Sequence, residues 1–99
     1  MQKIKPKKIH IISIGGSIMH DLAIHLKLKG NFITGSDDNI YDPARKNLKI
    51  HNILPKKLGY YKNNIKNNLD FVIIGMHTKN NNIELKEAKK FKIPIFSYP

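Results

Sequence analysis

The sequence predicts an α/β domain with a mostly parallel sheet of about five strands and helices on both faces. Two observations lead to this class. Short apolar runs rich in β-branched residues alternate along the chain with segments whose apolar residues recur every three or four positions. The first run, residues 9–14, stops at Gly15-Gly16, and a helical pattern starts at once. A strand, a glycine turn and a helix in this order suit a phosphate group at the helix N-terminus.

The first strand and helix are predicted from apolar spacing. Residues 9–14 are apolar enough for a parallel strand that is buried on both faces. We expect Ser17 to cap the helix that follows and Gly30 to adopt the left-handed conformation after its end, near Lys29. The apolar residues of this helix share one face: Ile18, Met19, Leu22, Ala23 and Leu26.

The next elements are a strand and a short helix. Residues 32–36 form the second predicted strand, which ends at Asp37-Asp38. Asp42-Pro43 has the pattern of an N-cap followed by a proline in the first helical turn. The helix then runs to about residue 51, and Asn52 is expected to end it in the left-handed conformation.

The middle of the chain is ambiguous over residues 53–61. Either Ile53-Leu54 or Leu58–Tyr60 could supply a further short strand, and Pro55 separates the two segments. Residues 63–68 are polar and fit a loop or a single helical turn. The number of strands in the sheet therefore depends on how this segment folds.

The pattern in the last third of the sequence predicts a strand, a helix and a second strand. Residues 69–75 form a strongly apolar strand, and residues 93–98 form the last one, with Pro94 near its start, where a missing N–H is tolerated. Residues 83–91 have helical spacing. The apolar face of this helix contains Leu85, Ala88 and Phe91.

Composition fits one domain of 99 residues. The net charge of +11 invites a nucleic-acid-binding function, but Arg45 is the only arginine among the 18 basic residues. Lysine, asparagine and isoleucine have AT-rich codons, so a genome rich in A and T explains this charge without a binding role.

Residues 1–8 are expected to form a basic tail. The absence of cysteine, of a cleavable signal and of an apolar run near the roughly 20 residues that span a bilayer favours a cytoplasmic protein.

Three groups of residues follow predicted strands, and the carboxyl ends of parallel strands meet at one edge of a sheet. The groups are Gly15-Gly16, Ser36-Asp37-Asp38 and Gly75-Met76-His77-Thr78. We expect them to form one ligand site. We predict no metal site and assign no chemistry to four histidines without metal-ligand spacing: His10, His20, His25 and His51.

Several motifs, in this order, resemble the N-terminal domain of the Mur ligases, and especially the branch that acts on UDP-N-acetylmuramate. They are Ile14-Gly15-Gly16 with Met19, then Thr34-Gly35-Ser36-Asp37, then Val72-Ile73-Ile74-Gly75-Met76-His77 followed by Asn81-Asn82-Ile83-Glu84-Leu85, and finally Ile95-Phe96-Ser97-Tyr98-Pro99. The resemblance covers residues 9–99. It implies a Rossmann-like three-layer fold.

The resemblance implies that this domain holds the UDP part of the substrate. Backbone N–H groups after the first strand would face the pyrophosphate, Asp37 would reach a ribose hydroxyl or the uracil edge, and His77 would contact phosphate or sugar. The implied substrate-binding residues are Gly15, Gly16, Ser17, Ile18, Met19, Ser36, Asp37, Asp38, Gly75, Met76 and His77. None of them is implied to be catalytic.

Ligation in this family uses ATP and magnesium in a central domain and a C-terminal domain for the incoming amine. This chain has no Gly-x-x-x-x-Gly-Lys-Ser/Thr motif, so we expect it to bind substrate without catalysing ligation alone. It would be a domain cut from a longer ligase, a relic reading frame, or a subunit. Its expected partners are UDP-N-acetylmuramate or a UDP-muramyl peptide, together with the missing ligase domains. We do not expect it to bind a membrane.

Four positions depart from the family pattern. Ser13 stands where many members have glycine, and Ile18 stands where several do. Asn81 and Ile83 stand where the family has aspartate and proline. Two other functions stay open. One is a stand-alone Rossmann-type module for NAD or another nucleotide, although the first and third glycines of Gly-x-Gly-x-x-Gly are missing. The other is a small basic nucleic-acid binder, whose affinity would fall steeply with salt.

Overall fold

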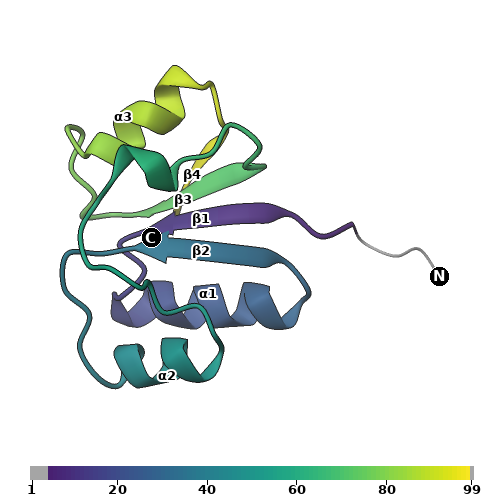
Figure 1. Ribbon diagram of the computed structural model, residues 1–99, viewed down its shortest axis with the longest axis vertical. Helices are drawn as coiled ribbons and strands as arrows, with labels where there is room; N and C mark the ends of the chain where they lie inside the picture. The colour runs from purple at the N-terminus through teal and green to yellow at the C-terminus, as the bar shows by residue number, and fades with distance from the viewer. Residues whose placement is uncertain (1–4, 99) are drawn as a thin grey trace.

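The computed structural model describes residues 5–98 and confirms the α/β class. Its strands are β1 (Lys8–Ile12), β2 (Phe32–Ser36), β3 (Phe71–Gly75) and β4 (Ile95–Tyr98). Its helices are α1 (Ser17–Leu28), α2 (Ala44–Ile50), the 3-10 turn η1 (Lys62–Asn64) and α3 (Ile83–Lys90). The strands form one parallel sheet in the order β2-β1-β3-β4. In Figure 1, α1 and α2 lie on one side of this sheet and α3 and η1 on the other.

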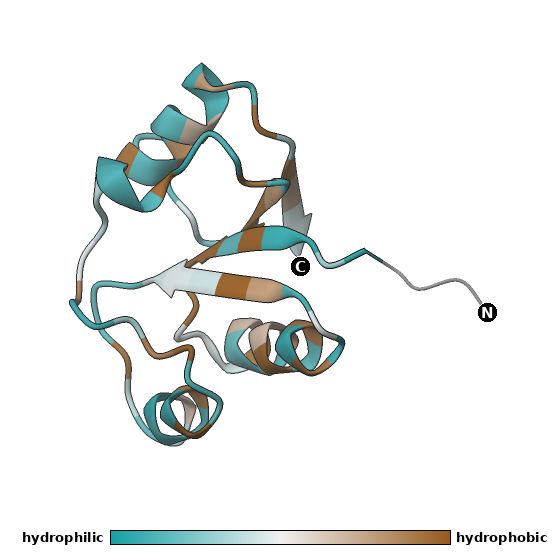
Figure 2. Ribbon diagram, turned by 45° about the vertical axis from the view of Figure 1, so that its right-hand side comes forward, coloured by the Kyte–Doolittle hydropathy of each residue, from teal (hydrophilic) through white to brown (hydrophobic). Residues whose placement is uncertain are grey.

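The central strand β1 is buried on both faces, as its apolar sequence predicts. Ile9 and Ile11 pack with residues of α1 and α2, whereas Ile12 packs on the other side of the sheet with Leu85 and Ala88 of α3. Each face of the sheet therefore has its own hydrophobic cluster. In Figure 2 the helices alternate between hydrophobic and hydrophilic bands, as expected for helices with one buried face.

The sheet has four strands in the described residues, so the prediction of about five is wrong. Residues 53–61 supply no strand and make only one isolated bridge, between Gly59 and Asp37. Pro55 lacks an N–H for a ladder, and Gly59 has a φ of 117°, which breaks an extended run. A loop or a single helical turn was expected over residues 63–68, and the structure has one turn, η1, which begins one residue earlier.

The N-terminal end of α1 differs from the prediction, and the C-terminal end agrees with it. Gly16, and not Ser17, is the N-cap residue, and no side chain caps it. Strand β1 ends at Ile12 because Ser13 has a φ of 68° and the N–H groups of Ser13 and Ile14 both donate to the Ser36 carbonyl. At the other end Gly30 has the expected left-handed conformation, with a φ of 99°.

The two remaining helices also have capping residues near their predicted ends. Pro43 is the N-cap residue of α2, while Asp42 Oδ1 accepts a hydrogen bond from Lys46 N–H at 3.1 Å. Asn52 follows α2 with the predicted left-handed φ, 60°. The Asn82 side chain caps α3 by accepting from Glu84 and Leu85 N–H groups. Each cap fixes where its helix starts or ends relative to the sheet.

The predicted basic tail lies partly outside the described residues. Lys8 begins β1 rather than ending a tail, because it pairs with Phe32 of β2. Residues 5–7 are exposed. Among the described helices, none is long and apolar enough to cross a membrane.

Candidate functional site

A cavity of about 370 Å³ lies at the carboxyl ends of β1 and β3. The β1–α1 turn forms one wall, and the segment after β3 forms another. Its lining residues are Ser13, Gly16, Ser17, Ile18, Met19, Asp37, Gly75, Met76, His77, Thr78 and Tyr98. All residues predicted for the site line this cavity except Gly15, Ser36 and Asp38. The parallel topology therefore brings the three predicted groups to one edge of the sheet.

Main-chain N–H groups at the start of α1 belong to residues that line this cavity, and they have no hydrogen-bond partner within residues 5–98. The first bond of the helix runs from His20 N–H to the Gly16 carbonyl, at 2.8 Å. The N–H groups of Ser17, Ile18 and Met19 precede it, and no side chain caps them. These groups and the helix dipole favour a negatively charged ligand.

Gly15 and Asp37 contact each other instead of both facing a ligand. Gly15 N–H donates to Asp37 Oδ2 at 2.8 Å. It is therefore not free to bind a pyrophosphate, and the expectation that it would do so is wrong. A Cβ on Gly15 would lie 2.8 Å from the same oxygen, which explains why glycine is needed there. Asp37 is only 8% exposed, and burial raises the pKa of its carboxyl despite the Gly15 hydrogen bond. Oδ1 already accepts from Asp38 N–H and from the Tyr60 hydroxyl, whereas Oδ2 accepts from Gly15 N–H and keeps a lone pair for a ligand hydroxyl.

A second cavity, of about 450 Å³, adjoins the first. The two share Ser13, Asp37, His77 and Thr78. The other lining residues of the second cavity are Asp38, Tyr60, Lys79, Asn81, Asn82 and Ile83. The predicted residue Asp38 thus lines the second cavity rather than the first. Together the two cavities make one continuous candidate site over the sheet edge.

Tyr60 belongs to the site, although sequence reasoning gave it no role. Its hydroxyl lies 2.8 Å from Ser13 Oγ and donates to Asp37 Oδ1 at 3.4 Å. Burial and the two neighbouring aspartates raise the pKa of Tyr60, so it stays a phenol at neutral pH. Its segment carried no periodicity that could have placed it here.

Thr78 offers a polar atom that has no partner within residues 5–98. Its Oγ1 is buried and makes no hydrogen bond, although the residue lines both cavities. Buried hydroxyls are normally paired, so this one suits a ligand or water partner.

Ser36 is not in either cavity, contrary to the prediction. Its side chain is buried, and its hydroxyl donates to Glu84 Oε1 at 2.5 Å. His10 Nε2 contacts the same oxygen at 2.7 Å, and His10 Nδ1 contacts Thr34 Oγ1, also at 2.7 Å. Sequence reasoning assigned His10 no chemistry, and in the structure it belongs to this buried network. No group of three or more metal-ligating side chains gathers among the described residues.

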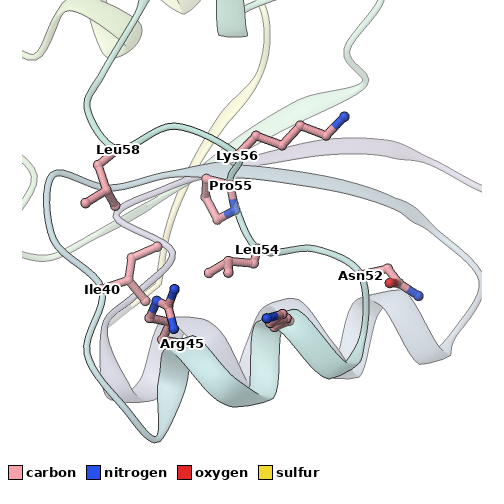
Figure 3. Close-up of a pocket in the computed structure, with 8 residues that line it drawn as sticks. Ile40, Arg45, Asn52, Leu54, Pro55, Lys56 and Leu58 are labelled. Carbon is pink, nitrogen blue, oxygen red and sulfur yellow. The ribbon is translucent and has the colours of Figure 1, made fainter.

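A larger cavity, of about 600 Å³, lies elsewhere, between α2 and residues 52–58 (Figure 3). Arg45, Lys49 and Lys56 line it together with apolar residues such as Leu54. None of the residues at the strand ends contributes to it. We therefore assign the candidate site to the sheet edge, where unpaired N–H groups, carboxylates and a free hydroxyl converge.

A parallel α/β sheet with a glycine turn, an uncapped helix N-terminus and an aspartate after the second strand defines a nucleotide-binding type of domain. Comparison with known proteins identifies the family: residues 8–99 match the description "Mur ligase family, catalytic domain". The chain belongs to the Mur ligase family, which confirms the resemblance predicted from its motifs.

Individual relatives agree with this assignment. The chain is 37% identical over 89 residues to the UDP-N-acetylmuramate–L-alanine ligase of Blochmanniella floridana, covering 90% of this chain and 18% of that protein. It is 37% identical over 96 residues to the ligase of the same name from Clostridium kluyveri, with coverages of 93% and 20%. The chain thus spans about a fifth of the length of these curated relatives.

Two solved structures have the same fold. A UDP-N-acetylmuramate–alanine ligase from Thermotoga maritima matches with a TM-score of 0.82 at 27% identity, covering 92% of this chain and 20% of that one. A UDP-N-acetylmuramate:L-alanyl-gamma-D-glutamyl-meso-diaminopimelate ligase from Neisseria meningitides matches with a TM-score of 0.81 at 28% identity, covering 94% and 29%. Both matches include nearly all of the sheet and helices described above.

Proposed function

We propose that this chain is the UDP-N-acetylmuramate-binding domain, residues 9–99, of a cytoplasmic, ATP-dependent ligase of peptidoglycan synthesis. The observation that carries the proposal is the cavity at the sheet edge, where the free N–H groups of Ser17, Ile18 and Met19 begin α1. The names of the relatives support the substrate class, because they act on UDP-N-acetylmuramate or a derivative.

The site chemistry suits a UDP-sugar. The diphosphate would accept hydrogen bonds from the N–H groups at the start of α1, where the helix dipole also favours negative charge. Asp37 would accept a hydrogen bond from a ribose hydroxyl or the uracil edge, and Asp38 lies in the adjoining cavity. His77 and the unpaired Thr78 hydroxyl line both cavities and can contact phosphate or sugar.

The ligation step needs groups that this domain does not supply. ATP and magnesium require a phosphate-binding loop and acidic metal ligands. The sequence has no Gly-x-x-x-x-Gly-Lys-Ser/Thr, and the described residues bring no three metal-ligating side chains together. The residues present therefore do not fit these cofactors, and we propose that this domain recognises substrate for catalytic domains located elsewhere.

Replacing Gly16 by valine is expected to weaken UDP-N-acetylmuramate binding at least about tenfold, a loss of about 1.4 kcal/mol. Gly16 lines the cavity, and the valine methyl groups would occupy space that the diphosphate needs. The fold should tolerate the change, because Gly16 has a φ of −61° and an added Cβ would lie 3.6 Å from the nearest atom, Met19 Cγ. Isothermal titration calorimetry measures the dissociation constant.

Gly30→Ala is the matched control. Gly30 lies at the other end of α1 with a φ of 99°, so alanine there strains the backbone by about 1 kcal/mol without changing the cavity. It should destabilise the chain and leave the dissociation constant unchanged. If Gly16→Val binds as tightly as wild type, the substrate does not occupy this cavity.

A further inference from the structure

A buried carboxylate lies behind the candidate site. Glu84 is in the first turn of α3, and its side chain is 0% exposed. It lines neither cavity, so the substrate proposed above would not contact it. An isolated ionised carboxylate is costly to bury, so its partners must compensate for the lost water.

Four donors surround this carboxylate, two on each oxygen. Oε1 lies 2.7 Å from His10 Nε2 and accepts from Ser36 Oγ at 2.5 Å. Oε2 accepts from Tyr61 N–H and from Asn64 Nδ2, both at 2.8 Å. Burial alone would raise the pKa of Glu84, but the hydrogen bonds from His10, Ser36 and Asn64 and the electrostatic attraction of His10 together lower it. Glu84 is therefore ionised at neutral pH, and His10 Nε2 is the donor in their hydrogen bond.

Two of these donors are the direct chain neighbours of site residues. Ser36 precedes Asp37, and Tyr61 follows Tyr60. The Tyr60 hydroxyl bonds to Ser13 and Asp37, at 2.8 and 3.4 Å. The two segments are also joined by Gly59 N–H, which donates to the Asp37 carbonyl at 2.7 Å. Glu84 therefore holds both chain segments whose side chains meet at the sheet edge.

We propose that Glu84 is a positioning residue of the substrate site, which fixes the Tyr60 hydroxyl against Asp37 by holding the adjacent residues Ser36 and Tyr61. The proposal rests on the function proposed above. A glutamine at this position has nearly the same size but only one oxygen. The NH2 group of the glutamine would replace one carboxylate oxygen and would itself be a donor that meets other donors. The glutamine therefore cannot accept hydrogen bonds from both chain segments at once.

The test is a double-mutant cycle on UDP-N-acetylmuramate binding. Glu84→Gln is expected to weaken binding about three- to tenfold, as measured by calorimetry at a temperature where each variant is folded. In a Tyr60→Phe background the same change should have little further effect, because the hydroxyl that Glu84 positions is already absent. Asn64→Ala removes one donor outside both cavities and should act in the same direction, about two- to threefold.

Ala88→Gly controls for stability alone. Ala88 is buried in the same helix, and glycine there costs roughly 1–2 kcal/mol without touching the carboxylate. It should leave the dissociation constant unchanged. Wild-type affinity in both Glu84→Gln and Asn64→Ala, or an equal loss for Glu84→Gln with and without the Tyr60 hydroxyl, would overturn the positioning role.

A second readout separates this proposal from the proposed function. NMR titration reports the pKa of Tyr60, which burial raises in the wild-type chain, with no substrate present. Glu84→Gln should move this pKa back toward its ordinary value of 10.0, and Ala88→Gly should not. An unchanged Tyr60 pKa in Glu84→Gln would contradict the positioning role. Failure of the wild-type chain to bind the UDP-sugar would contradict the proposed function alone.

Discussion

Replacing Glu84 by alanine is expected to lower the free energy of unfolding by about 3–5 kcal/mol. The change removes the acceptor for His10, Ser36, Tyr61 and Asn64, and it leaves buried donors without partners. Small domains have about 5–15 kcal/mol of stability in total, so this is a large fraction. Urea denaturation followed by circular dichroism measures the loss.

Glu87→Ala is the matched control for this variant. Glu87 lies in the same helix, and its side chain makes no hydrogen bond or ion pair with the described residues. Alanine there should change stability by no more than about 0.5 kcal/mol. Equal effects of the two substitutions would show that the network around Glu84 adds nothing to stability.

The contribution of Glu84 should also depend on pH. Because the folded-state pKa of Glu84 is lower than its ordinary value of 4.5, the carboxylate stabilises the fold above about that pH. This stabilisation is lost as the pH falls through the folded-state pKa. The difference in unfolding free energy between wild type and Glu84→Gln should shrink below pH 4.5. A difference that is constant from pH 7 to pH 3 would contradict an ionised Glu84.

Replacing Gly35 by alanine is expected to destabilise the chain by about 1–3 kcal/mol through overpacking. Gly35 is in β2, and an added Cβ would lie 2.8 Å from Ile14 Cβ and closer still to Ile14 Cδ1. Ile14 is fully buried and its Cβ is fixed to the backbone, so the strand itself would have to shift. Urea denaturation measures this loss as well.

A glycine in another strand provides the comparison for Gly35→Ala. Gly75 ends β3, and a Cβ there would meet only Met19 atoms, at 3.6 Å or more. Gly75→Ala should therefore remain within about 0.5 kcal/mol of wild type. If Gly35→Ala were equally harmless, the close approach of Ile14 to β2 would not constrain the fold.

The sequence was sufficient to predict the layers and the gathering of the candidate residues at one edge of the sheet. The apolar runs that became β1 and β3 are continuous because both faces of these strands are covered, and helical spacing marks α1 and α3. Once parallel strands are assumed, their carboxyl ends must share an edge. This is why Gly16, Asp37 and His77, which are far apart in the chain, line one cavity.

The buried polar network could not be predicted in the same way. Charged residues are almost always exposed, so Glu84 would be assigned to the solvent face of its helix. In the structure Glu84 is 0% exposed, whereas its apolar neighbour Ile83 is 43% exposed. Its partner His10 is 74 residues away in the chain, and no local pattern connects them.

Backbone geometry explains the other differences. The sequence does not tell which side chain at the end of a strand reaches a cavity, so Ser36 was expected at the site, but its hydroxyl bonds to Glu84. The hydrogen bond from Gly15 N–H to Asp37 could not be predicted from the sequence either, because it depends on the pairing of β2 with β1. Tyr60 reaches the site from a segment that has no regular structure.

The central claim is that UDP-N-acetylmuramate binds at the carboxyl edge of the sheet. The most direct measurement is an NMR titration of the isotope-labelled chain with this compound, with NAD as the comparison ligand. The claim predicts saturable shifts of the amides of Gly16, Ser17 and His77, and none with NAD at the same concentration. Shifts confined to the cavity between α2 and residues 52–58, around Arg45 and Lys49, or no shifts from a folded chain, would contradict it.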